Sequence, residues 1–442
     1  MEEDVKKVLS RRDFLKYAGI AGATVGVAGG LGGLLAACGG GETTTTTAAT
    51  TATTAGGPAT TAATTATTAA TTVSTTAEAA VLKIGAVLSL TDWYSVVDAA
   101  DKVDTEYVVQ MINDEGGIKA GGKAYKIELL VEDGKSSLDG NTAAATKLVL
   151  DEKVQHVIGP GAFFNVATSS IFEQAKVLHV ANYNGLAPGE MSKDTPYEFL
   201  GLDPIAQQSA ALKALKQLYP SVKTVTMATE DATYPPFEQP FKDLVAREGL
   251  TLAGDPVLFA TNAEDYNPTA AKIKSQNADG VWMPIGIPPS FAGIVKGLRT
   301  LGYTAPIVCP VDMPTHIALV GPEGSNDLVG ILSKSLDDPN IAAPLKKMLE
   351  MGDPKRQIFG LAPNALYMLR YAIEAADSLD PTAIRDKWQS LSTIPTLYGE
   401  GFPTASQLYG LTNHAWAYPI PVSRAMKAQI EYYPWIKPGV TP

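Results

Sequence analysis

The chain has 442 residues, with 46 aspartates and glutamates against 35 lysines and arginines, and a formal net charge of −11 at pH 7. An acidic balance of this size argues against a nucleic-acid partner and against a basic membrane-binding face. Two cysteines are present, Cys38 and Cys309. Because Cys38 belongs to the amino-terminal segment described next, Cys309 has no disulfide partner and is interpreted as a small buried hydrophobe.

The first 37 residues read as an export signal. Paired arginines, Arg11 and Arg12, precede a Gly- and Ala-rich apolar run that extends to Ala37, and this order resembles the twin-arginine signal of bacteria. The run ends in Leu-Ala-Ala followed by Cys38, which resembles the site where a lipoprotein is cut and its cysteine acylated. A transmembrane anchor is the weaker alternative, since many glycines interrupt the run. We predict a signal peptide over 1–37 and lipidation at Cys38.

A spacer of Thr, Ala and Gly follows, and with Cys38 it makes up residues 38–79. It has no apolar periodicity and too few hydrophobic residues to offset the entropy of ordering, so it is predicted to be disordered. Roughly 360 residues remain, which exceeds the usual size of one core and predicts two lobes.

Strands and helices then alternate along the chain. The first unit is a strand at Leu82–Leu88, a helix that ends near Ile112 at Gly116-Gly117, and a strand at Lys126–Val131. Further predicted strands are His156–Ile158, Val177–Ala181, Val222–Met227, Thr251–Phe259, Gly280–Met283, Ile307–Cys309, Val329–Ser333 and a segment within Ala415–Ile420. Predicted helices are Ser137–Leu150, Val166–Ala175, Ile205–Leu218, Phe237–Glu248, Pro268–Ser275, Phe291–Leu301, Ala342–Met351, Asn364–Ala376 and Pro381–Leu391. The alternation predicts an α/β fold with a mostly parallel sheet, flanked by helices, in each lobe.

Four segments, in their order and spacing, carry a resemblance to a known family. They are the Ile112–Ile118 stop with the strand that ends in Glu132-Asp133, the run His156–Pro160, Gly201-Leu202-Asp203, and Asp265–Pro268 leading to Ala278–Val281. Together they resemble the leucine/isoleucine/valine-binding family of type I periplasmic binding proteins, over about Val81 to Met426. The resemblance implies two lobes joined by three crossings that close on a ligand. We expect lobe I at 80–202 plus 334–408, and lobe II at 203–333 plus 409–442.

Open α/β sheets bind ligands at the carboxyl ends of their strands, so the loops there hold the candidate site. The candidate ligand-binding residues are Trp93, Tyr94, Ala162, Phe163, Asn184, Gly185, Tyr234, Gly286 and Asp312.

The resemblance assigns roles to these positions, and this chain departs from several. Phe163 stands where the family has a serine, and Gly286 where it has a tyrosine, whereas Tyr234 matches. The family's acidic residue, which holds a ligand ammonium, falls at Val311 or Asp312. The hypothesis is a ligand other than a plain branched-chain amino acid, because the aromatic residues of these loops suit a flat apolar group. In the alternative, several of the aromatics pack into the sheets, as Trp282 is expected to, and Asn184 and Asp312 serve as turn or cap residues.

The sequence supplies little for catalysis. His156, His179, His316 and His414 lack metal-ligand spacing, and Gly159-Pro160-Gly161 is too short for a phosphate loop. We expect no metal, no cofactor and no enzyme activity.

The expected function is that of an exported, lipid-anchored, monomeric solute-binding protein at the outer face of the cell membrane. It would deliver a small organic solute, which is amino-acid-like, an amide or an aromatic acid, to an ABC permease. The alternatives are a ligand sensor of the same fold coupled to a membrane receptor, and a cell-surface enzyme.

Overall fold

The computed structural model describes residues 80–161, 164–183, 190–261, 263–332, 334–353, 356, 359–404 and 410–438. The predicted signal, Cys38 and the spacer lie outside these ranges. Among the helices described, none combines the length and hydropathy that a membrane span requires.

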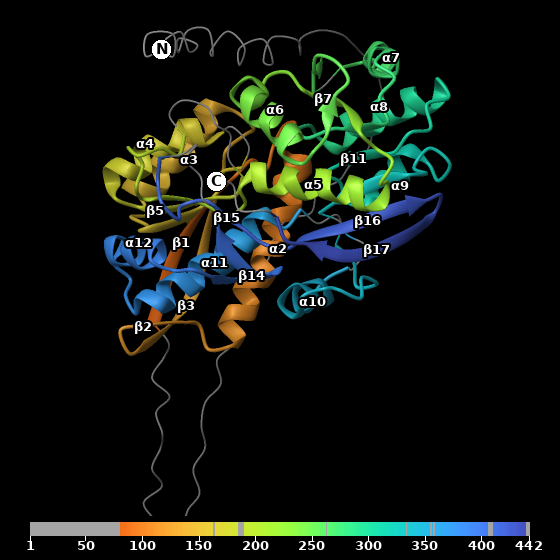
Figure 1. The fold of residues 1–442 in the computed structure, drawn as a ribbon. Coiled ribbons are helices and arrows are strands. Elements are labelled where there is room, and N and C mark those ends of the chain that lie inside the picture. Colours follow the sequence, from red (N-terminus) through yellow and green to blue (C-terminus); the bar gives the residue numbers. More distant parts are fainter. Residues whose placement is uncertain are drawn as a thin grey trace, which may run out of the picture. The chain divides into compact units, whose positions relative to one another are not determined.

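The first sheet has six strands in the order β2-β3-β1-β4-β5-β6 and is parallel except for β2. Figure 1 labels β1, β2, β3 and β5 of this sheet. Its strands are β1 (Ala80–Leu88), β2 (Ile118–Ala120), β3 (Lys123–Asp133), β4 (His156–Ile158), β5 (Leu178–Ala181) and β6 (Glu198–Leu200). Its helices are α2 (Ser95–Asp114), α3 (Leu138–Leu150), α4 (Asn165–Ala175), α11 (Leu361–Ala376) and α12 (Pro381–Gln389).

Alternate residues of β1 divide this lobe into two core layers, as the pleat of a strand requires. Leu82, Ile84 and Ala86 share a core with the apolar face of α2 and with α11. Val87 packs with Leu148 and Phe172 of α3 and α4 on the other face. The sheet is therefore buried on both sides, which explains the nearly continuous apolar runs of its strands.

The second sheet has eight strands, in the order β17-β16-β12-β11-β10-β7-β8 with β9 paired to β7. Its strands are β7 (Thr224–Glu230), β8 (Thr251–Leu252), β9 (Val257–Phe259), β10 (Gly280–Trp282), β11 (Ile307–Cys309), β12 (Leu328–Ile331), β16 (Ile420–Met426) and β17 (Gln429–Ile436). The helices beside it are α5 (Pro204–Leu218), the 3₁₀ turn η3 (Pro235–Phe237), α6 (Glu238–Arg247), α7 (Asn267–Ser275), α8 (Pro288–Thr300) and α9 (Met313–Val320). All of its strands run in one direction except β16, which is antiparallel to both of its neighbours, β12 and β17.

The chain passes between the two sheets three times, as the fold class predicts. It crosses from β6 to α5, from β12 towards α10 (Ala343–Glu350) and α11, and from β15 (Trp416–Ala417) to β16. β15 closes a small antiparallel sheet with β13 (Ile394–Thr396) and β14 (Gly399–Pro403). Which residues move with which lobe stays a prediction.

The structure corrects several element predictions. The strand predicted over Thr251–Phe259 is two short strands, because Gly254-Asp255-Pro256 interrupts its pairing. α9 was not predicted, although Pro314 stands in its first turn, where a missing N–H costs least. The strands β2, β6, β13, β14, β16 and β17 were also missed. Cys309 is buried in β11, and burial raises the pKa of its thiol.

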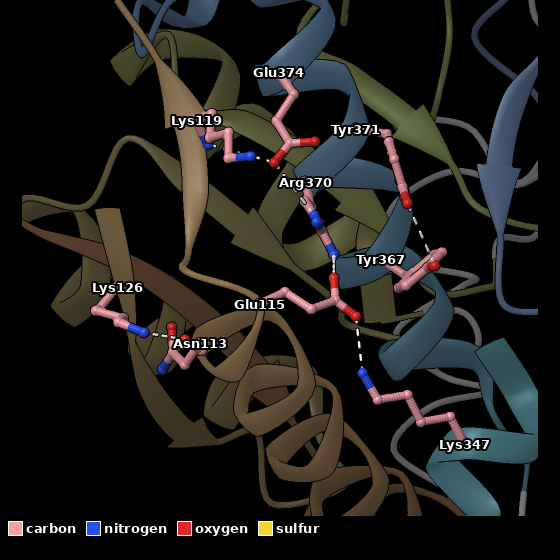
Figure 2. A network of polar contacts seen from close by, with 9 residues as sticks. All are labelled: Asn113, Glu115, Lys119, Lys126, Lys347, Tyr367, Arg370, Tyr371 and Glu374. Atoms are coloured by element: carbon pink, nitrogen blue, oxygen red, sulfur yellow. Dashed lines mark hydrogen bonds and ion pairs between the residues drawn. The ribbon is translucent and has the colours of Figure 1, made fainter. Parts of the chain in front are cut away.

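The Gly-Gly stop after α2 is formed as predicted. The backbone N–H of Gly117 donates to the carbonyl of Ile112, and both Gly116 and Gly117 have positive φ, +102° and +87°. Just before them, Glu115 binds Arg370 of α11 at 2.6 Å and Lys347 of α10 at 2.9 Å (Figure 2). The end of α2 is therefore tied to both later helices.

The two glycines give a matched pair of substitutions. A Cβ on Gly117 would overlap the carbonyl of Tyr125, whereas a Cβ on Gly116 would meet nothing within 4 Å. Gly117→Ala should lower the free energy of unfolding by about 3 kcal/mol or more, and Gly116→Ala by about 1 kcal/mol, in urea titrations. Equal effects of the two substitutions would contradict the close approach of Gly117 to β3.

Candidate functional site

An aromatic cluster lies at the carboxyl end of the first sheet. Trp93 and Tyr94 follow β1, and Phe164 follows β4. The ring centroids of Trp93 and Tyr94 are 5.3 Å apart, and those of Tyr94 and Phe164 are 5.7 Å apart, both edge-to-face. Tyr94 and Phe164 are buried and Trp93 is half-buried. Gly161 allows this packing, because its Cβ would lie 3.1 Å from the Tyr94 hydroxyl oxygen.

Hydrogen bonds fix the loop that carries Trp93 and Tyr94. Asp133 accepts from the N–H of Leu90 at 2.8 Å and from the hydroxyl of Thr91 at 3.0 Å. Ser136 accepts from the N–H of Tyr94 at 3.1 Å and donates to the carbonyl of Thr91. Burial opposes ionisation of Asp133, but these and neighbouring N–H donors hold its pKa below the ordinary value. The acid at the end of β3 therefore positions the site loop.

Three buried aspartates lie on the inner face of α2, at Asp98, Asp101 and Asp104. Asp98 accepts from the N–H of Ser89 at 2.7 Å, and Asp104 pairs with Arg356 at 2.7 Å. Their i, i+3 spacing on one helix face is visible in the sequence, but their use as buried anchors was not predicted.

Asp101 caps the first turn of α11. Its carboxylate accepts from the N–H groups of Gly360, Leu361 and Ala362 at 2.7, 3.0 and 2.8 Å. Burial raises its pKa to about 6, with a further contribution from Asp104, although these donors act in the opposite direction. An acid of α2 thus fixes the point at which the chain re-enters the first lobe.

Asp312, a candidate ligand residue on the second sheet, caps α9. It accepts from the backbone N–H of Thr315 at 3.2 Å and from its hydroxyl at 2.8 Å. Burial raises the pKa of Asp312, while Thr315 and the nearby Lys334 favour its charged form. Asp312 therefore caps a helix, which was the alternative to its predicted role in ligand binding.

Lys334 follows β12 at the second crossing and was not predicted as part of the site. Its side chain is 3% exposed, and its Nζ donates to the carbonyl of Phe359 and lies 5.7 Å from the ring centroid of Tyr398. Burial lowers its pKa to about 8, while Asp101, Asp312 and Asp104 oppose this shift. The charge of this one buried lysine is therefore stabilised by acids of α2 and by Asp312, which precedes α9.

The other candidates of the second lobe follow β7 and β10. Tyr234 is 4% exposed, its hydroxyl has no hydrogen-bond partner among the described residues, and burial raises its pKa to about 12. A Cβ on Gly286 would lie 2.8 Å from Phe291, so the backbone is what position 286 can offer. Trp282, the last residue of β10, is fully buried, as predicted, and donates to Gln208.

Four candidates, Ala162, Phe163, Asn184 and Gly185, lie outside the described residues, and their part in the site stays a prediction. Within the described ranges, no group of His, Cys, Asp and Glu is placed to hold a metal ion. His156, His179, His316 and His414 are buried, and burial lowers the pKa of each to about 4.

The raised pKa of Asp101 predicts a pH dependence. The folded protein keeps this proton up to about pH 6, whereas the unfolded chain releases it near about pH 4, so the contribution of Asp101 to stability falls as pH rises between them. Asp101→Asn removes the titration. The free energy of unfolding of the variant relative to wild type should rise by roughly 3 kcal/mol from about pH 4 to 6 and then stay level. A pH-independent difference in urea titrations would contradict the assignment.

Comparisons with known proteins agree with this architecture. The model of the periplasmic binding protein family matches residues 81–417. A leucine-binding protein, LivK, from Thermotoga maritima is 21% identical, with a TM-score of 0.64 over 81% of this chain and 99% of its own. LivJ from Streptococcus pneumoniae, solved with isoleucine, is 19% identical, with a TM-score of 0.65 over 81% and 100%. A solute-binding protein from R. palustris, solved with 4-hydroxybenzoate, is 19% identical, with a TM-score of 0.63 over 81% and 97%. With more than half of its length matched by the family model, the chain belongs to the periplasmic binding protein family.

Proposed function

We propose that the protein captures a small organic solute outside the cytoplasm and delivers it to an ABC permease, by closing its two lobes about the three crossings. We further propose export through the amino-terminal signal and anchoring by a lipid on Cys38. Hinge closure needs no covalent chemistry, and it stays reversible when the ligand favours the closed state by a few kcal/mol.

The observation that carries the ligand class is the aromatic cluster of Trp93, Tyr94 and Phe164. It stands at the carboxyl end of the first sheet, where open α/β sheets bind ligands. A ring stacked on such a cluster gains about 0.5–1.5 kcal/mol per ring pair beyond its buried area. An aromatic acid or amide suits this surface better than leucine does.

The partners that Asp312 already has within the protein also support an aromatic ligand over an α-amino acid. Its carboxylate already accepts two hydrogen bonds from Thr315 and lies near the ammonium of Lys334. A second ammonium, brought by an α-amino acid, would compete with these partners. Similar folds have been solved with isoleucine, with 4-hydroxybenzoate and with benzoate, so the fold itself accommodates either class.

A thermal-shift panel of amino acids, aromatic acids, amides and urea tests the proposal on the full chain. The largest stabilisation is expected from an aromatic solute, and Trp93→Ala should weaken its binding roughly 3- to 10-fold in calorimetric titrations, because one ring contact is lost. Tyr371→Ala is the control, because it also removes an aromatic ring, but one that lies on α11 beside Arg370 and is not part of the aromatic cluster (Figure 2).

Two outcomes would count against this function. A large shift with leucine or valine and none with aromatic solutes would contradict the aromatic ligand class. Steady turnover of a bound solute by pure protein would replace the binding function with an enzymatic one.

A further inference from the structure

Asn182, directly after β5, is a buried side chain whose amide has no hydrogen-bond partner in the described part of the chain. The residue is 1% exposed, and neither its Oδ1 nor its Nδ2 has a hydrogen-bond partner among the residues that the structure describes. Its backbone is held in place, because its N–H donates to the carbonyl of Pro160 at 3.2 Å. Leaving both halves of a buried amide unpaired is costly, and such groups in native proteins call for an explanation.

The position of Asn182 supplies that explanation. Val180 pairs with Ile158 of β4, and Ile158 pairs with Ala86 of β1. Asn182 therefore lies just past the carboxyl ends of β4 and β5 and level with Leu88, the last residue of β1. Its Nδ2 approaches Gly159, whose Cβ would lie 3.3 Å away.

The aromatic cluster begins at the same turn. The Tyr94 hydroxyl faces Gly161, two residues after Gly159. Asn182 and Tyr94 therefore lie against one short turn, Gly159–Gly161, at the ligand-binding edge of the sheet.

Other unpaired polar atoms occupy equivalent places. The hydroxyl of Ser89, directly after β1, is buried without a partner in the described part of the chain. On the second sheet, the same holds for the hydroxyls of Thr229, near the end of β7, and Tyr234, in the loop that follows. Strand ends of both sheets thus present polar groups that have no partner among the residues described by the structure.

We propose that Asn182 binds the ligand and that the ligand is an aromatic carboxamide. The inference rests on the proposed function and narrows its ligand class. The side chain of Asn182 offers two N–H donors and one carbonyl acceptor. A carboxamide donates to Oδ1 and accepts from Nδ2 at once, whereas a carboxylate only accepts and leaves Oδ1 unpaired. The aromatic ring of the ligand packs on Trp93, Tyr94 and Phe164.

Calorimetric titration of the full chain with benzamide, benzoate and leucine tests the assignment. Benzamide is expected to bind about tenfold more tightly than benzoate, because only the amide pairs both atoms of Asn182. Asn182→Leu should weaken the binding of benzamide at least about tenfold. It should also raise the melting temperature of the unliganded protein, because it removes two unpaired polar atoms. Asn182→Asp, which keeps the shape but loses the donors, should also weaken benzamide.

Asn141 provides the matched control. It is a buried asparagine of α3 whose Nδ2 donates to the carbonyls of Gly134 and Ser137 at 3.0 and 2.8 Å. Asn141→Leu should lower the melting temperature and leave benzamide affinity unchanged, because it removes the two hydrogen bonds that Nδ2 makes within the fold, although Oδ1 has no partner among the described residues.

The possible failures are distinguishable. Benzoate that binds as tightly as benzamide, or an Asn182→Leu protein that binds benzamide as wild type does, overturns the role of Asn182. Leucine or benzoate binding without benzamide binding overturns the amide class and leaves the solute-binding function standing. A protein that no solute of the wider panel stabilises contradicts the proposed function and this inference together.

Discussion

The capping of α11 by Asp101 is the interaction on which the arrangement of the site depends. Three backbone N–H groups at the start of α11 converge on one buried carboxylate that belongs to another helix, α2. α2 follows directly on Tyr94, in the aromatic cluster, and the capped residues follow directly on Phe359, whose carbonyl binds Lys334. Asp101 therefore connects three parts of the structure: the site loop, the second crossing and the packing of α2 against α11. An acid placed this deeply is tolerated because donors surround it and a lysine lies close by.

The sequence predicts the fold well where local chemistry decides it. Gly116 and Gly117 end α2 where a helix stop was expected, and the alternation of apolar runs predicts the parallel strands of both sheets except β6. The misses have different causes. β17 pairs with the edge of β16, and the strand-forming Ile, Tyr and Trp residues of Gln429–Ile436 were a local signal that the prediction passed over. α9 begins at a Pro-containing segment that reads equally well as a turn.

The candidate site was predictable to a smaller extent. Strand ends identify Trp93, Tyr94 and Tyr234, because the edge of a parallel sheet follows from strand direction alone. The role of Asp312 as a cap could only be weighed against ligand binding, since an aspartate before a short helix fits both. Asn182 directly follows the predicted strand Val177–Ala181, so its place at this edge was predictable, but its buried, unpaired amide was not. Lys334 was not predicted at all, because burial of a polar side chain depends on elements far away in the chain.

Two of the three crossings run side by side. Leu200 and Ala415 form a parallel bridge, the N–H of Leu200 donates to the carbonyl of His414, and the N–H of Asp203 donates to that of Trp416 at 2.7 Å. Chains that are hydrogen-bonded to each other bend together, so these crossings restrict the lobes to few independent motions. In the closure that we propose, an open form restricted in this way would have little conformational entropy left to lose. More of the free energy of ligand contact then remains as affinity.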